Sequence, residues 1–135
     1  MGRRVLTRRT VLLQAARTPS PPGAELYFIS PADGAVIKGP VTVVIGLSGM
    51  GVAPAGIDVA NTGHHHVLVN APADIKLNDA VPADVEHRHF GLGQTEATLT
   101  LPPGRHTLQW LLGDKGHVPH DPPVLSEKIT ITVQP

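Results

Sequence analysis

The sequence predicts an all-β fold, an antiparallel immunoglobulin-like β-sandwich of about seven strands, with a cupredoxin-like sandwich as the alternative. Three observations predict it. Short apolar, β-branched runs alternate with polar residues at a period of two. Fourteen glycines and fourteen prolines, spread without a repeat, separate these runs. No stretch combines a 3.6-residue periodicity with the capping residues of a helix.

The length of 135 residues predicts one domain with a core of useful size. Residues 1–24 are rich in arginine and end in a Pro-rich segment, so we expect a basic disordered tail or a degenerate export signal there. Residues 25–135 are expected to form the sandwich. No apolar run reaches the roughly 18 residues of a membrane helix, which predicts no integral membrane segment.

The first half of the domain contains three expected strands. Residues 26–29 form the first, and Pro and Asp-Gly signals place a turn at 30–34. Residues 41–47 form the second, because apolar residues occupy every other position. A glycine-rich loop over 49–63 leads to a third strand at 64–70.

The second half contains a long irregular connection and three more strands. The connection covers residues 71–93, and a strand with clean alternation follows at 95–101. The turn signal Pro-Pro-Gly at 102–104 predicts a hairpin between that strand and the next one, at 105–112. The last strand is expected at 127–133, with its isoleucines and valine directed inward.

Charge and composition exclude several classes of function. The chain is neutral overall, but after the first 22 residues it has 6 basic and 11 acidic residues, and such an acidic body argues against nucleic-acid binding. Cysteine is absent, which excludes disulfides, thiolate metal sites, a cysteine nucleophile and a blue-copper centre. Four aromatic residues give no stacking platform for sugars or bases.

Eight histidines are the most distinctive feature, and all lie between residues 64 and 120. They occur as HHH at 64–66, HRH at 87–89, a lone His106, and HVPH at 117–120. If the strands alternate in direction, the first, second and fourth groups meet at one pole of the sandwich. Loops at one end of such folds commonly carry function. His106 is expected at the opposite end.

Histidine clusters have the character of metal ligands, because a neutral imidazole nitrogen binds transition metals well. The alternative for each group is structural: imidazoles at a strand edge, or imidazoles bonded to loop carbonyls. His65 and His106 share their strand faces with apolar residues, which favours a place in or beside the core. The candidate metal ligands are therefore His64, His66, His87, His89, His117 and His120.

The ligand type favours copper or zinc as the cofactor, with nickel also compatible. Met50 leaves a mixed His/Met Cu(I) site open, and Glu96 and Asp121 are candidate carboxylate ligands or partners that orient an imidazole. Because binding needs neutral imidazoles, we expect affinity to fall below about pH 6.5.

Several motifs together resemble the bacterial domain-of-unknown-function 4399 family over residues 25–135. The resemblance implies a small protein exported to the bacterial periplasm, hence a periplasmic or secreted location, and it implies no particular activity. It maps the family's histidine motifs onto the HHH, HRH and HVPH groups. The motifs that carry it are FISPADG at 28–34, GLSGMGVAPAG at 46–56, NTGHHH at 61–66, HFGLGQTE at 89–96, GD at 113–114 and HVPHDPPV at 117–124.

Two hypotheses follow from the sequence. The first is a periplasmic histidine-rich protein that binds a metal ion in copper or zinc handling. The second is a non-enzymatic interaction module that binds a periplasmic protein or envelope component through the same loops. An enzyme is not expected, because no nucleophile, base and orienting group can be named together.

Overall fold

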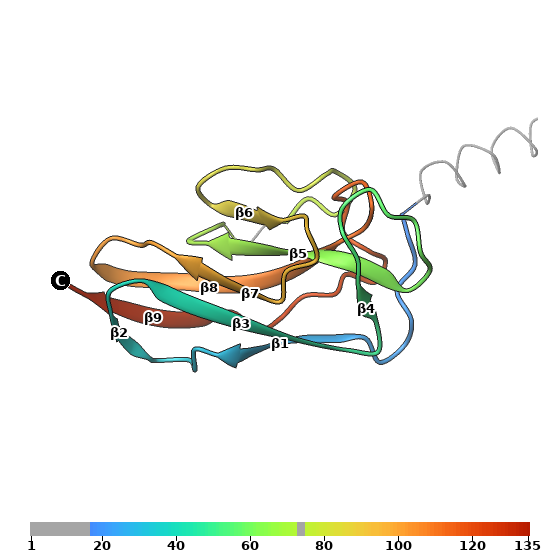
Figure 1. Cartoon of the computed structure of the whole chain (residues 1–135). Helices are drawn as coiled ribbons and strands as arrows, with labels where there is room; N and C mark the ends of the chain where they lie inside the picture. The colour runs from blue at the N-terminus through green and yellow to red at the C-terminus, as the bar shows by residue number, and fades with distance from the viewer. Residues whose placement is uncertain (1–16, 73–74) are drawn as a thin grey trace, which may run out of the picture.

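The structure is a computed structural model that describes residues 17–72 and 75–135. It is an all-β sandwich of two sheets (Figure 1), as the sequence predicts. The apolar segment at 11–16 and the arginines before it, on which the expectation of an export signal depends, lie outside the described residues.

The smaller sheet has three strands in the order β1–β3–β7, and both pairings are antiparallel. Its strands are β1 (Glu25–Ser30), β3 (Val41–Ser48) and β7 (Glu96–Leu99).

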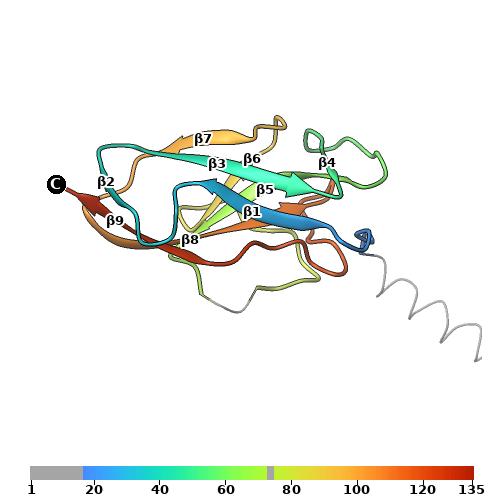
Figure 2. The same cartoon turned by 90° about the horizontal axis from the view of Figure 1, so that it is seen from below.

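The larger sheet has six strands in the order β2–β9–β8–β5–β4, with β6 pairing with β5 as well. In Figure 2, which views the molecule from below, its strands β5 and β8 pass behind β1 and β3. Its strands are β2 (Val36–Lys38), β4 (Gly51–Val52), β5 (Thr62–Val69), β6 (His87–Phe90), β8 (Gly104–Gly113) and β9 (Ile129–Gln134).

The core lies between the two sheets and follows the predicted alternation. Val41, Val43 and Ile45 are buried on β3, and Ile131 and Val133 are buried on β9. On β8 the alternation buries the three residues Leu108, Trp110 and Leu112.

The predicted hairpin between residues 95–101 and 105–112 is wrong. β7 pairs with β3 in the smaller sheet, whereas β8 pairs with β5 and β9 in the larger one. The Pro-Pro-Gly segment at 102–104 therefore carries the chain from one sheet to the other. A turn signal between two alternating runs does not distinguish these cases, because both bury one face of each strand.

Three short strands were not predicted. β2 and β4 each form a parallel pair, with β9 and β5 respectively, so the sheets are not purely antiparallel. β6 lies inside the connection at 71–93 that was expected to be irregular, and it pairs antiparallel with β5. Within the described residues no helix is long and apolar enough to span a membrane.

The end of the predicted tail contacts the sandwich. Asp121 donates its backbone N–H to the carbonyl of Thr18, at 2.9 Å, and Ser20 donates its own to the carbonyl of Asp121, at 3.0 Å. Residues 17–20 thus run beside the loop after β8, before the first strand starts at Glu25.

Candidate metal centre

Strand β5 is the foundation of the site, and it is buried on both faces. Alternation directs His65 toward Trp110 in the core, with ring centroids 5.9 Å apart. His64 and His66 therefore share the opposite face of the sheet, outside the sandwich core. All three side chains are fully buried. The core covers His65, whereas the rings of His89 and His117 lie against His64 and His66 on the outer face.

Strand β6 adds a third imidazole to this face. His89 lies directly across from His66 in the antiparallel register, and side chains of such opposite pairs are close neighbours. The His89 ring centroid is 5.2 Å from that of His66 and 5.1 Å from that of His64. The side chain of His89 remains exposed on its outer side.

The loop after β8 supplies the fourth imidazole, from His117. Its ring centroid is 4.8 Å from that of His64 and 4.6 Å from that of His89. We call His64, His66, His89 and His117 the histidine cluster. It joins three of the sequence groups at one pole, as the alternating-direction argument predicts.

Asp114 builds the turn that presents His117. Its Oδ1 accepts the backbone N–H groups of Gly116 at 2.8 Å and Val118 at 3.0 Å. The His117 N–H bonds to the Asp114 carbonyl at 2.9 Å, and His117 has a φ of 67°. This backbone conformation is uncommon for a residue with a side chain, and neighbouring contacts must hold it.

Three nitrogen atoms converge inside the cluster. His64 Nε2 is 3.0 Å from His117 Nδ1 and 3.1 Å from His66 Nε2. The three nitrogen atoms that these residues offer as ligands all lie within 4.8 Å of one another. A single metal ion placed between these nitrogens could bind all three, which is the number of protein ligands found in many zinc sites.

Glycine makes room for the rings at two positions. A Cβ at Gly113 would lie 2.7 Å from His66 Nε2, and a Cβ at Gly91 would lie 2.6 Å from His89 Nε2. Gly113 is the cross-strand partner of His64 on β8. The rings of His66 and His89 therefore occupy the space that a side chain at Gly113 or Gly91 would fill.

The surroundings keep the inner imidazoles neutral. Burial, and then the charges that His117 and His89 would carry, lower the pKa of His64 to about 4. Burial, and then His64, lower the pKa of His66 to about 3. Partial burial and His117 also lower the pKa of His89. Neutral rings at pH 7 keep the lone pairs that a metal requires.

The three nitrogens could hold a first-row transition metal if the rings reorient around it. Tetrahedral Zn–N bonds of about 2.0–2.1 Å place ligand nitrogens about 3.3 Å apart. Two of the separations, 3.0 and 3.1 Å, are slightly shorter than this. The rings of His66 and His117 are the most widely separated pair, with centroids 5.8 Å apart and ligand nitrogens within 4.8 Å, so the three rings would have to reorient around a bound ion. The donor set is entirely imidazole, which suits copper and zinc.

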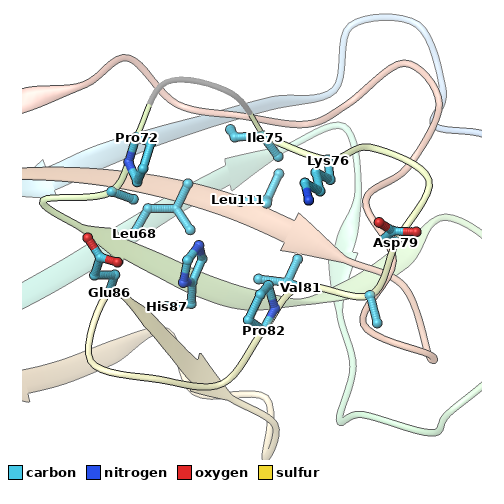
Figure 3. A pocket seen from close by; sticks show the side chains of 12 residues that line it. Leu68, Pro72, Ile75, Lys76, Asp79, Val81, Pro82, Glu86, His87 and Leu111 are labelled. Carbon is cyan, nitrogen blue, oxygen red and sulfur yellow. The ribbon is translucent and has the colours of Figure 1, made fainter.

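His87 belongs to the same motif as His89 but lies outside the cluster. It lies two residues before His89, at the start of β6 and opposite Leu68, and its Nδ1 is 2.7 Å from Asp84 Oδ1. It lies in a pocket of about 460 Å³ with Leu68 and Glu86 (Figure 3). The predicted ligand His87 is therefore bonded to Asp84 beside an apolar pocket and lies away from the converging nitrogens.

His120 also lies apart from the converging nitrogens. It is fully buried, and its Nε2 is 3.3 Å from the carbonyl of Thr62, with Gly63 beside its ring. It anchors the loop to the start of β5. The structural alternative considered for HVPH thus describes His120, whereas His117 enters the cluster.

The other candidate ligands lie elsewhere. Met50 packs against the hydrophobic core, and Glu96 is exposed on β7 in the other sheet. Asp121 is exposed, and its backbone bonds to residues 18 and 20. His106 sits beside the core, as expected, with its Nε2 2.7 Å from the Pro102 carbonyl.

Sequence reasoning missed the residues that shape the loop. Asp114 is nearly buried, and Thr18 Oγ1 donates to its Oδ2 at 2.7 Å. Burial opposes ionisation of Asp114, but the hydrogen bonds from Thr18, Val118 and Gly116 lower its pKa below the usual value. The signal for the turn was the Asp-Lys-Gly sequence at 114–116, which is typical of an Asx turn.

These features define a class: a small all-β sandwich with a buried histidine cluster at one pole of its larger sheet. Residues 43–134 match the sequence profile of the family described as Domain of unknown function (DUF4399). The chain belongs to this family, which confirms the resemblance seen in its motifs.

Comparisons with curated proteins and with solved structures give no information on function. No curated protein matches the sequence. Among solved structures, the endo-beta-1,4-mannanase from Thermotoga petrophila is similar at a TM-score of 0.44 and 21% sequence identity. The match covers 82% of this chain and 19% of that one, so this chain spans about a fifth of the mannanase. No functional argument follows at that TM-score.

Proposed function

We propose that this protein binds one transition-metal ion, copper or zinc, and takes part in handling that metal. His64, His66 and His117 are the three proposed ligands. The observation that carries the proposal is the convergence of their three nitrogen atoms within 4.8 Å at a buried position. Four imidazoles gathered in one place serve no evident packing purpose, since apolar side chains would fill the same volume without polar atoms.

The proposed site is buried on one side and open on the other. His64 and His66 form its floor, whereas His117 is half-buried and His89 is exposed. A metal would enter and leave past His89, and we propose that His89 serves as an exchangeable fourth ligand. Such access favours transfer of the ion over permanent storage. We therefore propose that the protein takes part in metal handling and that the bound ion is not purely structural.

The first test is metal content. Tag-free protein is incubated with copper or zinc, desalted and analysed by mass spectrometry. We expect about one ion per chain in the wild type, and none above background in the double variant His64→Ala, His66→Ala. The His87→Ala variant is the matched control, because it also removes an imidazole from this sheet, and it should retain the ion. Wild-type protein without retained metal would contradict the proposal.

One observation favours the alternative of an interaction module. The nitrogen separations of 3.0 and 3.1 Å are hydrogen-bond distances, so the imidazoles can hold one another without metal. In that case they stiffen loops that bind a protein or envelope partner. The His117→Asn variant separates the two functions, since asparagine tolerates the positive φ. Loss of metal with the fold retained favours metal binding, and a lower melting temperature with no metal effect favours the module.

We also propose that the protein works without catalysis and in the periplasm. The proposal of no catalysis is supported by the site itself, because within residues 17–72 and 75–135 the hydrogen bonds of the His64, His66 and His117 ring nitrogens join these rings to one another. The second is supported by the arginine-rich start followed by apolar residues at 11–16. A fusion of residues 1–24 to a reporter that is active only after export tests the location, and an inactive reporter would contradict it.

A further inference from the structure

We propose that Thr18 is a positioning residue for the metal centre and that residues 17–20 act as a strap holding the loop that carries His117. The inference rests on the proposed metal binding, and it assigns a role to a segment that the sequence placed in a disordered tail. The strap is separated from His117 by about 100 residues in sequence, yet it contacts the same loop on its outer side.

The strap makes contact along its whole length. The Arg17 guanidinium donates to the carbonyls of Pro119 and His120, with Nε 3.3 Å from the Pro119 oxygen. Ser20 Oγ donates to the Pro122 carbonyl at 2.6 Å. With the two backbone bonds to Asp121 and a parallel bridge, the strap lies against the loop like a short added strand.

The link to the metal centre passes through a single carboxylate. Thr18 Oγ1 donates to Asp114 Oδ2 at 2.7 Å, while Asp114 Oδ1 accepts the N–H groups on both sides of His117. One oxygen of Asp114 thus faces the strap, and the other shapes the turn. Hydrogen bonds to a charged carboxylate are stronger than neutral ones. Thr18 therefore holds the Asp114 carboxylate in the orientation that shapes the turn carrying His117.

The backbone of His117 needs this support. Its φ of 67° lies in a region that residues other than glycine adopt at a cost, so a free loop would relax away from it. Relaxation would withdraw His117 Nδ1 from His64 Nε2 while leaving the floor of the site on β5 intact. Loosening the strap should therefore weaken metal binding without unfolding the sandwich.

The test compares four proteins by titration with Zn²⁺ or Cu²⁺ in competition with a chelator. Thr18→Val removes the hydroxyl at nearly constant volume, and Thr18→Ser keeps it. Thr42→Val is the matched control, because Thr42 bonds to Thr98 on the surface of the other sheet. We expect a dissociation constant about three- to tenfold higher for Thr18→Val, and values within about twofold of wild type for Thr18→Ser and Thr42→Val.

Equal affinity of Thr18→Val and wild type would overturn the inference while leaving metal binding established. If the wild type binds no metal, the proposed function is wrong. The strap is then tested by amide hydrogen exchange in the metal-free protein. Faster exchange at the amides of Gly116 and Val118 in Thr18→Val, but not in Thr18→Ser, would support the strap. Unchanged exchange at both amides would overturn it.

Discussion

Gly113 is the residue whose small size the histidine cluster depends on most directly. It lies across from His64 on β8, and a methyl group there would approach His66 Nε2 to 2.7 Å. Real side chains do not reach that distance without a shift of the ring. We therefore expect Gly113→Ala to disturb the site at its floor, where the rings are fully buried.

We expect Gly113→Ala to abolish tight metal binding and to lower the free energy of unfolding by about 1–3 kcal/mol, the usual cost of overpacking. Gly116→Ala is the matched control. Its added methyl would lie in ordinary contact with Asp114, at 3.6 Å, and should change stability by less than about 0.5 kcal/mol. Metal titration and urea unfolding measure both effects. Normal metal affinity in Gly113→Ala would show that the close approach of His66 to Gly113 does not matter for metal binding.

His65 gives the protein a pH-dependent stability. Burial lowers its pKa to about 4 from 6.5, so between these pH values the unfolded chain binds a proton that the folded chain excludes. The free energy of unfolding therefore falls as the pH drops from above 6.5 toward 4. For this group the loss is on the order of 3 kcal/mol, and burial of His64 and His66 acts in the same direction.

The measurement is urea unfolding of metal-free protein between pH 7.5 and 4.5. We expect stability to be highest above pH 6.5, and His65→Leu to be less sensitive to pH because leucine cannot bind a proton. If His65→Leu shows the same slope as wild type, its burial does not contribute to the acid sensitivity.

At the scale of elements, the edge strand β6 gives His87 and His89 different surroundings. His89 is opposite His66, whereas His87 is opposite Leu68 and pairs with Asp84. We expect His89→Ala to speed metal release on the order of tenfold, and His87→Ala to leave the rate unchanged. Stopped-flow transfer of the metal to a chromophoric chelator gives both rates. Equal rates for the two variants would exclude an exchange role for His89.

Strands of both sheets could be predicted, because strict alternation marks β3 in the smaller sheet and β8 and β9 in the larger one. The same alternation separates His65 from His64 and His66, so the sequence alone predicts which of these histidines share a face of β5. β6 could not be predicted, since four residues within a loop of more than twenty carry no periodic signal. The pairing of β7 with β3 could not be predicted from the sequence either, because the register between distant strands depends on tertiary packing.

The candidate site was predictable in outline and not in detail. Strand direction brought three histidine groups to one pole, but it could not show that His117 turns inward while His120 anchors the loop. That difference depends on Asp114 and on contacts from Thr18, about 100 residues away in sequence. Contacts between segments so far apart leave no pattern in a single sequence.

At the scale of the whole molecule, metal binding should stabilise the fold. The proposed ligands come from β5 and from the loop after β8, so an ion would join them in the folded state and not in the unfolded chain. We expect the melting temperature to rise with metal concentration, with a gain of about 2.7 kcal/mol when free metal exceeds the dissociation constant a hundredfold. The double variant His64→Ala, His66→Ala should show no rise. An equal rise in both proteins would indicate binding elsewhere.

The most direct test of the metal centre is anomalous X-ray scattering from crystals grown with copper or zinc, measured at the absorption edge of that metal. We expect one strong peak at about 2.0–2.1 Å from His64 Nε2, His66 Nε2 and His117 Nδ1. A peak at another place on the surface, or no peak with the three imidazoles still bonded to one another, would contradict the proposal.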